Sequence, residues 1–187
     1  ALTALDAGPD RFVEYSLAQA VFALEEDWRQ PLQEGTLTFG SPAHLAFVLE
    51  TNGGEISAGL ARRALGGDLA PADRARLLVV LARLGGPEDL GGILAEAAKS
   101  GDPALLEALA EATRSRGVVP KPLEGKSLTD LMGAKDEATA AAAIRLAGLW
   151  KVDGLGDAIA AKALDESAST ALRRDAFLSL ARIRGAA

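Results

Sequence analysis

The stretch Arg76-Leu-Leu-Val-Val-Leu-Ala-Arg-Leu-Gly85 is one of three copies of a single pattern, an apolar helical run that ends in glycine. The other copies are His44-Leu-Ala-Phe-Val-Leu-Glu-Thr-Asn-Gly53 and Leu106-Glu-Ala-Leu-Ala-Glu-Ala-Thr-Arg-Ser-Arg-Gly117. The terminal glycines at positions 53, 85 and 117 are 32 residues apart. Glycine just beyond a helix end can adopt the left-handed conformation of a cap, because it has no Cβ to clash. The pattern therefore predicts a helical repeat.

Shorter recurring motifs extend the repeat toward the C-terminus. Leu81-Ala82-x-Leu84 recurs as Leu146-Ala147-x-Leu149 and again as Leu180-Ala181-x-Ile183. Each repeat is predicted to hold a second helix, at residues 56–65, 87–99 and 155–164. Pro87 and Pro103 suit a first helical turn, where a missing N–H costs nothing. Two helices at a period in the thirties are typical of an α-solenoid.

The N-terminal part departs from this pattern. Residues 10–28 are predicted to form one long amphipathic helix, and residues 30–41, which contain Pro31, are predicted to be mostly loop. The apolar residues at helical spacing in this helix are Phe12, Val13, Leu17, Val21 and Leu24. Residues 1–40 are therefore expected to form a cap or a partial repeat.

A second irregularity lies at residues 118–126. Pro120 and Pro122 exclude a regular helix there, and a short helix is expected to resume at residues 127–132. A degenerate repeat with a loop and a loop that reaches a partner are both open interpretations.

We therefore predict an all-α fold, a right-handed α-α superhelix of the HEAT/armadillo kind. It is expected to have about five helix pairs, one of them degenerate. Residues 1–187 are expected to form a single domain, in which residues 41–187 hold the HEAT-like repeats.

Composition limits the function classes. The net charge is −6, whereas proteins that grip nucleic acid usually carry a basic surface, so no nucleic-acid partner is expected. The absence of Cys excludes disulfides and thiolate metal sites within the chain. No apolar run approaches the length of about 18 residues needed to cross a membrane, so no membrane insertion is expected. Because the chain begins with Ala1 rather than Met, we expect a fragment or a processed mature chain.

No catalytic, cofactor-binding or metal-binding motif is recognised. His44 is the only histidine, and it follows a good N-cap and N1 pair, Ser41-Pro42, so a structural or surface role is expected. The acidic run Glu25-Glu26-Asp27 is expected to be a solvated helix end, since adjacent helical residues point in different directions. Gly91-Gly92, inside a predicted helix, is interpreted as a place of close helix packing.

Candidate partner contacts are polar side chains of second helices, together with one of the two tryptophans. For both tryptophans, core packing is the competing interpretation, while an exposed ring would be a candidate hot spot. The candidate residues are Trp28, Arg62, Arg63, Glu88, Asp89, Glu96 and Lys99.

The N-terminal hundred residues also resemble a known family. The resemblance lies in Phe12-Val-Glu-Tyr-Ser-Leu-Ala-Gln-Ala-Val-Phe-Ala-Leu24, Trp28, Gly35-Thr-Leu-Thr-Phe39 and Leu45-Ala-Phe-Val-Leu49. They are similar to the HEAT-repeat region of large multidomain proteins of planctomycete- and verrucomicrobia-type bacteria, in which a dehydrogenase-like propeller, HEAT repeats and a c-type cytochrome module share one chain. The resemblance implies a connector between modules of an exported, periplasmic protein. It transfers no haem binding, since the chain has no Cys.

These observations favour a non-enzymatic scaffold or interaction module that binds another protein or neighbouring domains of the same parent chain. A glycosylase-like or lyase-like enzyme is the first alternative, which the acidic charge and the lack of a catalytic motif disfavour. A passive spacer between domains is the second. A spacer should lack an exposed apolar patch, so the surface distinguishes the two. The sequence leaves the oligomeric state open.

Overall fold

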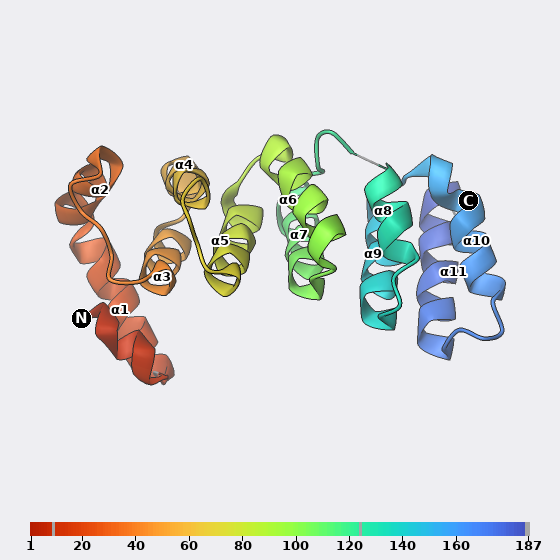
Figure 1. Cartoon of the computed structure of the whole chain (residues 1–187), viewed down its shortest axis with the longest axis horizontal. Coiled ribbons are helices and arrows are strands. Elements are labelled where there is room, and N and C mark those ends of the chain that lie inside the picture. Colours follow the sequence, from red (N-terminus) through yellow and green to blue (C-terminus); the bar gives the residue numbers. More distant parts are fainter. Residues whose placement is uncertain (9, 124, 186–187) are drawn as a thin grey trace. The chain divides into compact units, whose positions relative to one another are not determined.

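The computed structural model describes residues 1–8, 10–123 and 125–185, and within them every regular element is a helix (Figure 1). The all-helical prediction is confirmed. The chain divides into two compact units, Ala1–Leu84 and Gly85–Ala187. The repeat type, the handedness and the single-domain organisation stay predictions.

Unit 1 consists of one 3-10 helix and five α-helices. They are η1 (Leu2–Ala7), α1 (Arg11–Ala23), α2 (Glu25–Glu34), α3 (Pro42–Asn52), α4 (Gly54–Leu65) and α5 (Pro71–Leu84). Helix α3 packs against α1, α4 and α5, and α4 also packs against α5. The α3 helix is therefore the centre of this unit.

The start of α3 follows the predicted cap chemistry, and its end coincides with the predicted glycine. The Ser41 hydroxyl accepts a hydrogen bond from the N–H of His44 at 3.2 Å, and Pro42 occupies the first helical turn. Gly53, with φ +69°, follows the last residue of the helix, and its N–H donates to Leu49 O. Gly53 thus follows a real helix end, but with ψ −168° it does not adopt the left-handed cap conformation expected of it.

The prediction of one long helix at residues 10–28 is wrong, because the helix breaks at Leu24. The side chain of Trp28 folds back, and its Nε1 donates to Val21 O at 2.8 Å in the last turn of α1. Carbonyls of a last turn lack helical partners, so this bond stabilises the break. The loop predicted at residues 30–41 is also shorter than expected, since α2 continues through Pro31 to Glu34.

Unit 2 consists of six α-helices and one 3-10 turn. They are α6 (Pro87–Ser100), α7 (Pro103–Arg116), α8 (Gly125–Met132), α9 (Glu137–Leu149), η2 (Asp153–Leu155), α10 (Gly156–Leu164) and α11 (Thr170–Arg184). Figure 1 shows α6 beside α7, α8 beside α9 and α10 beside α11, and these neighbours are in contact. Helix α9 also contacts α7 and α11, which makes one layer of three helices.

Proline and glycine delimit these helices as expected. Pro87 and Pro103 each open a helix, while Gly101 and Gly117 follow helix ends with φ of +66° and +68°. Each positive φ is a conformation that residues with a Cβ rarely adopt. The positions of proline and glycine in the sequence therefore predicted the helix boundaries of this unit well.

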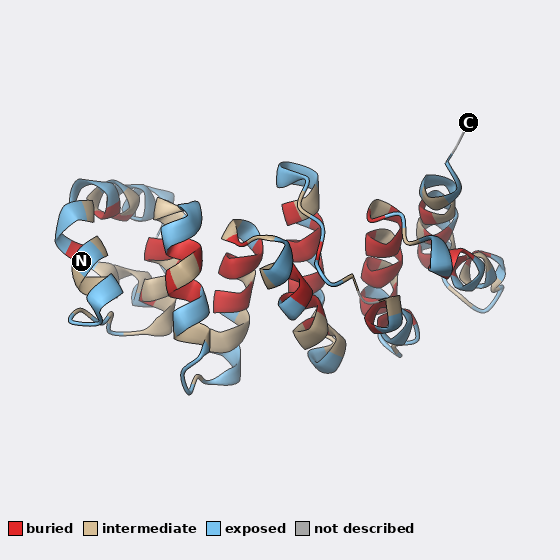
Figure 2. Ribbon diagram, turned by 90° about the horizontal axis from the view of Figure 1, so that it is seen from above, coloured by how far each residue is buried: buried red, intermediate tan, exposed pale blue. Residues whose placement is uncertain are grey.

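Buried residues gather on the sides of the helices that face their neighbours (Figure 2). Leucine, isoleucine and alanine supply most of this core, as the composition implies. The largest fully buried side chains of unit 2 are Leu90, Ile93, Leu94, Leu105, Leu106, Leu109, Leu128, Ile144, Leu146 and Ile159.

The irregular segment predicted at residues 118–126 is confirmed up to residue 123, but Gly125 and Lys126 already belong to α8. The Lys121 N–H donates to Pro87 O at 2.7 Å, so this loop is attached to the start of α6. Gly91 lies beneath it, and a Cβ there would be 2.8 Å from Lys121 C. The close approach expected at Gly91 is real, but loop backbone makes it rather than a helix.

Candidate interaction surfaces

Trp28 is not an exposed contact. Its side chain is 7% exposed and lies in a core cluster with Val21 and Val48. Trp150 is buried as well, and its Nε1 donates to Thr113 Oγ1 at 2.9 Å. Both tryptophans therefore have the core-packing role.

Arg62 and Arg63 are adjacent and exposed on α4, but they differ in their partners. Arg62 Nη2 lies 2.6 Å from Glu55 Oε1, in an exposed ion pair of the same helix. Arg63 Nη1 donates to the Gln33 carbonyl oxygen at 2.6 Å and thus contacts the C-terminal turn of α2. The Arg63 contact therefore joins α4 to a different element of unit 1.

The other four candidates belong to α6, in the other compact unit. Glu88, Glu96 and Lys99 follow one another at helical spacing, and Lys99 Nζ lies 3.3 Å from Glu96 Oε1. Asp89 Oδ2 accepts from the Gly86 N–H at 2.8 Å, which caps the start of the helix. Glu88 and Lys99 are exposed, whereas Asp89 and Glu96 are half-buried.

An exposed aromatic surface on α1 was missed by the sequence prediction. Phe12, Tyr15 and Phe22 are 67%, 65% and 50% exposed. Their spacing of three and seven residues puts them on one side of the helix, which we call the α1 aromatic face. The buried residues Leu17 and Val21 lie on the opposite side.

The apolar residues at helical spacing in the predicted N-terminal helix do not all face the core. Leu17 and Val21 are buried, whereas Val13 is 37% exposed and Leu24 53% exposed. The sequence did contain the signal, since Tyr15 and Phe22 extend an apolar stripe that begins at Phe12. A helix with two apolar stripes can bury only one of them against its own unit.

A second exposed apolar site lies at the other end of the chain, on α11. Phe177 and Leu178 are 51% and 52% exposed, and Leu164, at the end of α10, is 70% exposed. These residues supply one aromatic ring, whereas the α1 aromatic face supplies three. The α1 aromatic face is therefore the stronger candidate for a contact surface.

Unit 1 also contains a pocket of about 370 Å³ between α2 and α5, which we call the α2–α5 pocket. Its apolar lining residues include Leu32, Leu37, Phe39, Leu45, Leu60 and Leu77. Arg63 is the only charged residue among those that line it. The pocket is therefore a mostly apolar concavity with one charged side chain in its lining.

The remaining polar groups singled out in the sequence have structural partners. His44 is buried, and its Nε2 lies 2.9 Å from Asp6 Oδ1 of η1. The acidic run at residues 25–27 occupies the first turn of α2, where the helix dipole favours negative charge, and Glu25 pairs with Arg29. Among the described residues, no group of three His, Cys, Asp or Glu side chains could hold a metal ion.

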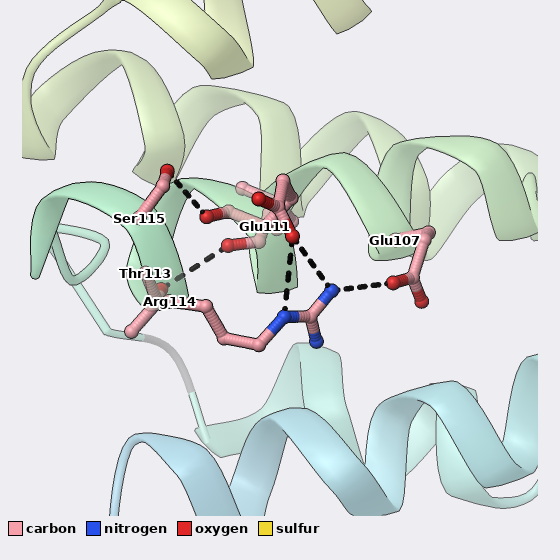
Figure 3. A network of polar contacts seen from close by, with 6 residues as sticks. Glu107, Glu111, Thr113, Arg114 and Ser115 are labelled. Carbon is pink, nitrogen blue, oxygen red and sulfur yellow. Dashed lines mark hydrogen bonds and ion pairs between the residues drawn. The ribbon is translucent and has the colours of Figure 1, made fainter.

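A network of charged and polar side chains lies on α7 (Figure 3). Arg114 Nη2 lies 2.6 Å from Glu107 Oε1 and 3.1 Å from Glu111 Oε2. The hydrogen bond to Glu107 is the main reason why the pKa of Arg114 is raised. All these partners belong to one helix, so the network stabilises α7 rather than forming a site between elements.

No protein-family model, curated protein or solved structure matches this chain. In the part of the chain that the structure describes, none of the helices combines the length and the apolar character needed to cross a membrane.

Proposed function

We propose that this chain is a non-enzymatic interaction module, which binds another protein or a neighbouring domain of its parent chain through the α1 aromatic face. The observation that supports the proposal is the exposure of Phe12, Tyr15 and Phe22 on one side of α1. Tyr and Trp are enriched among binding hot spots. Large aromatic rings that stay exposed keep apolar surface in unfavourable contact with water.

The same observation favours a binding module over a passive spacer. A spacer needs a polar outer surface, since its terminal helices meet only water. Here α1 turns three aromatic rings outward, and Arg11 lies over the Phe12 ring with its guanidinium carbon 4.9 Å from the ring centroid. Covering these rings with a partner removes apolar surface from water and stabilises the complex.

The wider setting of the module is also a proposal. The HEAT-like resemblance of the N-terminal hundred residues supports a connector in a multidomain, exported bacterial protein. The sequence of the parent gene tests this directly. Flanking propeller and cytochrome modules are expected, and a gene encoding these 187 residues alone would count against it.

The interaction itself is tested by photo-crosslinking. A benzoylphenylalanine introduced at Tyr15 is expected to crosslink one discrete partner in cells that express the parent protein. The same probe at Phe177, exposed on α11, is the matched control. The captured partner is then purified and must bind the unlabelled chain. Crosslinks that are equal at both positions, or a partner that fails to bind when purified, would refute the α1 assignment.

A further inference from the structure

We propose that the α2–α5 pocket binds an extended acidic peptide segment of a partner protein. An apolar side chain of the peptide fills the pocket, and an adjacent Asp or Glu pairs with Arg63. This inference rests on the proposed function, because it assumes an interaction module. It adds a second contact site and states the chemistry of the partner.

The apolar part of the inference follows from the pocket walls. Leu60 and Leu77 form a buried base, with exposed fractions of 8% and 0%. Around them, Leu32, Leu37 and Leu45 are only partly buried. When an apolar side chain displaces water from a concave site with half-covered apolar walls, the burial of apolar surface stabilises the complex.

The charged part follows from the position of Arg63. Its Nη1 donates to Gln33 O at 2.6 Å, and its Nη2 lies so close to Gly35 that a Cβ there would be 2.7 Å away. These contacts orient the guanidinium at the edge of the pocket. None of the carboxylates in the described residues pairs with it, and a guanidinium has five N–H donors. A planar, oriented and uncompensated cation favours a carboxylate ligand.

The carboxylate is assigned to a side chain rather than to a peptide C-terminus. Terminal carboxylates are usually held by several free backbone N–H groups. In the loop beside Arg63, the N–H of Gly35 donates to Leu32 O, and those of Thr36 and Leu37 donate to Pro31 O. Because these three N–H groups already have partners, they cannot cradle a terminal carboxylate, and the charged donor beside them is Arg63, which suits an internal Asp or Glu.

The net charge of −6 does not oppose this assignment at physiological salt. The Debye length there is about 8 Å, so a bound carboxylate interacts mainly with charges in its immediate surroundings. Arg63 is the charged residue of the pocket lining. The pairing should therefore weaken as salt rises, because Arg63 is exposed.

The test uses three capped hexapeptides that differ only at their two central residues: Gly-Ser-Leu-Asp-Gly-Ser, the same peptide with Leu-Asn, and the same peptide with Ala-Asp. Each is titrated into the ¹⁵N-labelled chain and followed by NMR. The Leu-Asp peptide is expected to shift the amides of residues 35–45 and the Arg63 Nε–H signal. It should bind about tenfold more tightly than either of the other two peptides.

Two variants separate the charge from the pocket. Arg63→Gln is expected to remove the preference for Asp over Asn, while Arg62→Gln, whose side chain pairs with Glu55 and does not line the pocket, should keep it. Ala64→Leu places a larger side chain in the pocket lining and should abolish binding of all three peptides with Arg63 intact. This second variant keeps the test decisive if Arg63→Gln destabilises unit 1.

Equal affinity for the Asp and Asn peptides, binding that survives Ala64→Leu, or absence of binding by the Leu-Asp peptide would each overturn the inference. These results are independent of crosslinking at Tyr15, which lies outside the pocket lining. The inference about the pocket can therefore fail while the α1 aromatic face still binds its partner.

Discussion

Gly148 of α9 lies against Ser179 of α11 so closely that a Cβ on the glycine would be 2.6 Å from Ser179 Cα. Ser179 is 1% exposed, and its hydroxyl has no hydrogen-bond partner among the described residues. The contact is thus a close approach of two helix backbones, with a buried hydroxyl left unsatisfied beside it.

Gly148→Ala is therefore expected to destabilise unit 2. Alanine favours helix over glycine by about 1 kcal/mol, but overpacking against a backbone atom costs about 1–3 kcal/mol or more. We expect a net loss of up to about 2 kcal/mol in the free energy of unfolding, measured by urea denaturation. An increase in stability would show that α9 and α11 are not this close.

Ser179→Ala should have the opposite effect. It removes a buried hydroxyl whose desolvation is not compensated, so the free energy of unfolding should stay constant or rise by about 1 kcal/mol. The same urea denaturation measures it. A loss above about 1 kcal/mol would mean that the hydroxyl has a partner in solution.

Gly91 and Gly92 provide a matched pair on α6. A Cβ at Gly91 would overlap the Lys121 carbonyl, while one at Gly92 has nothing within 4 Å. Gly91→Ala should cost about 1–3 kcal/mol and expose the Lys121 N–H to hydrogen exchange, because the loop must leave Pro87. Gly92→Ala should stabilise by up to about 1 kcal/mol. Similar effects of both substitutions would contradict the loop position.

The bond between Trp150 Nε1 and Thr113 Oγ1 predicts a coupling between α7 and the end of α9. Thr113→Val leaves the buried indole N–H unpaired, also removes the hydrogen bond from the Thr113 hydroxyl to Val118 O, and should cost about 1–3 kcal/mol. Combined with Trp150→Phe in a double-mutant cycle, the coupling energy should be about 1 kcal/mol. A coupling energy near zero would show that the two side chains do not form this hydrogen bond in solution.

Two carboxylates at the start of α9 predict the acid dependence of unit 2. Hydrogen bonds from Thr139 lower the pKa of Asp136, and those from Ser169 lower the pKa of Glu137. Both carboxylates therefore stabilise the folded state above their ordinary pKa values of 3.8 and 4.5. This stabilisation is lost as the pH falls through their lowered pKa values in the folded state. Thermal melting should show the loss below about pH 4.5.

Asp136→Asn is the control for this acid dependence. Asparagine can still cap α9 but does not titrate, so the variant should lose less stability on acidification than the parent chain. Identical pH profiles of the melting temperature would mean that Asp136 does not contribute.

Many helix boundaries were predictable because proline and glycine lie at the helix ends. Pro87, Pro103 and Gly117 delimit helices through their own backbone preferences, which act locally and so can be recognised in the sequence. The break at Leu24 was not predictable, because it depends on the return of the Trp28 side chain to Val21 O. That bond is a tertiary contact, which helical periodicity does not encode.

The candidate surface was predicted less well. Periodicity showed that α1 is rich in apolar residues, but it does not tell which of two apolar sides meets a neighbouring helix. Leu17 is buried whereas Phe12 is exposed, and the packing of α1 against α3, α2 and η1 decides between them. Arg63, one of the charged candidates, lines the α2–α5 pocket, and its contact with Gln33, 30 positions away in sequence, was not predictable from periodicity.

The affinity of the partner captured at Tyr15 is the most direct test of the α1 aromatic face. It is measured by isothermal titration calorimetry for the parent chain, for Phe12→Ser/Tyr15→Ser/Phe22→Ser and for the control Phe177→Ser/Leu178→Ser. The triple variant should bind at least about 30-fold more weakly, since a hot-spot residue contributes about 2 kcal/mol or more. The control should bind like the parent chain. Unchanged affinity of a folded triple variant would contradict the claim that this chain binds through α1.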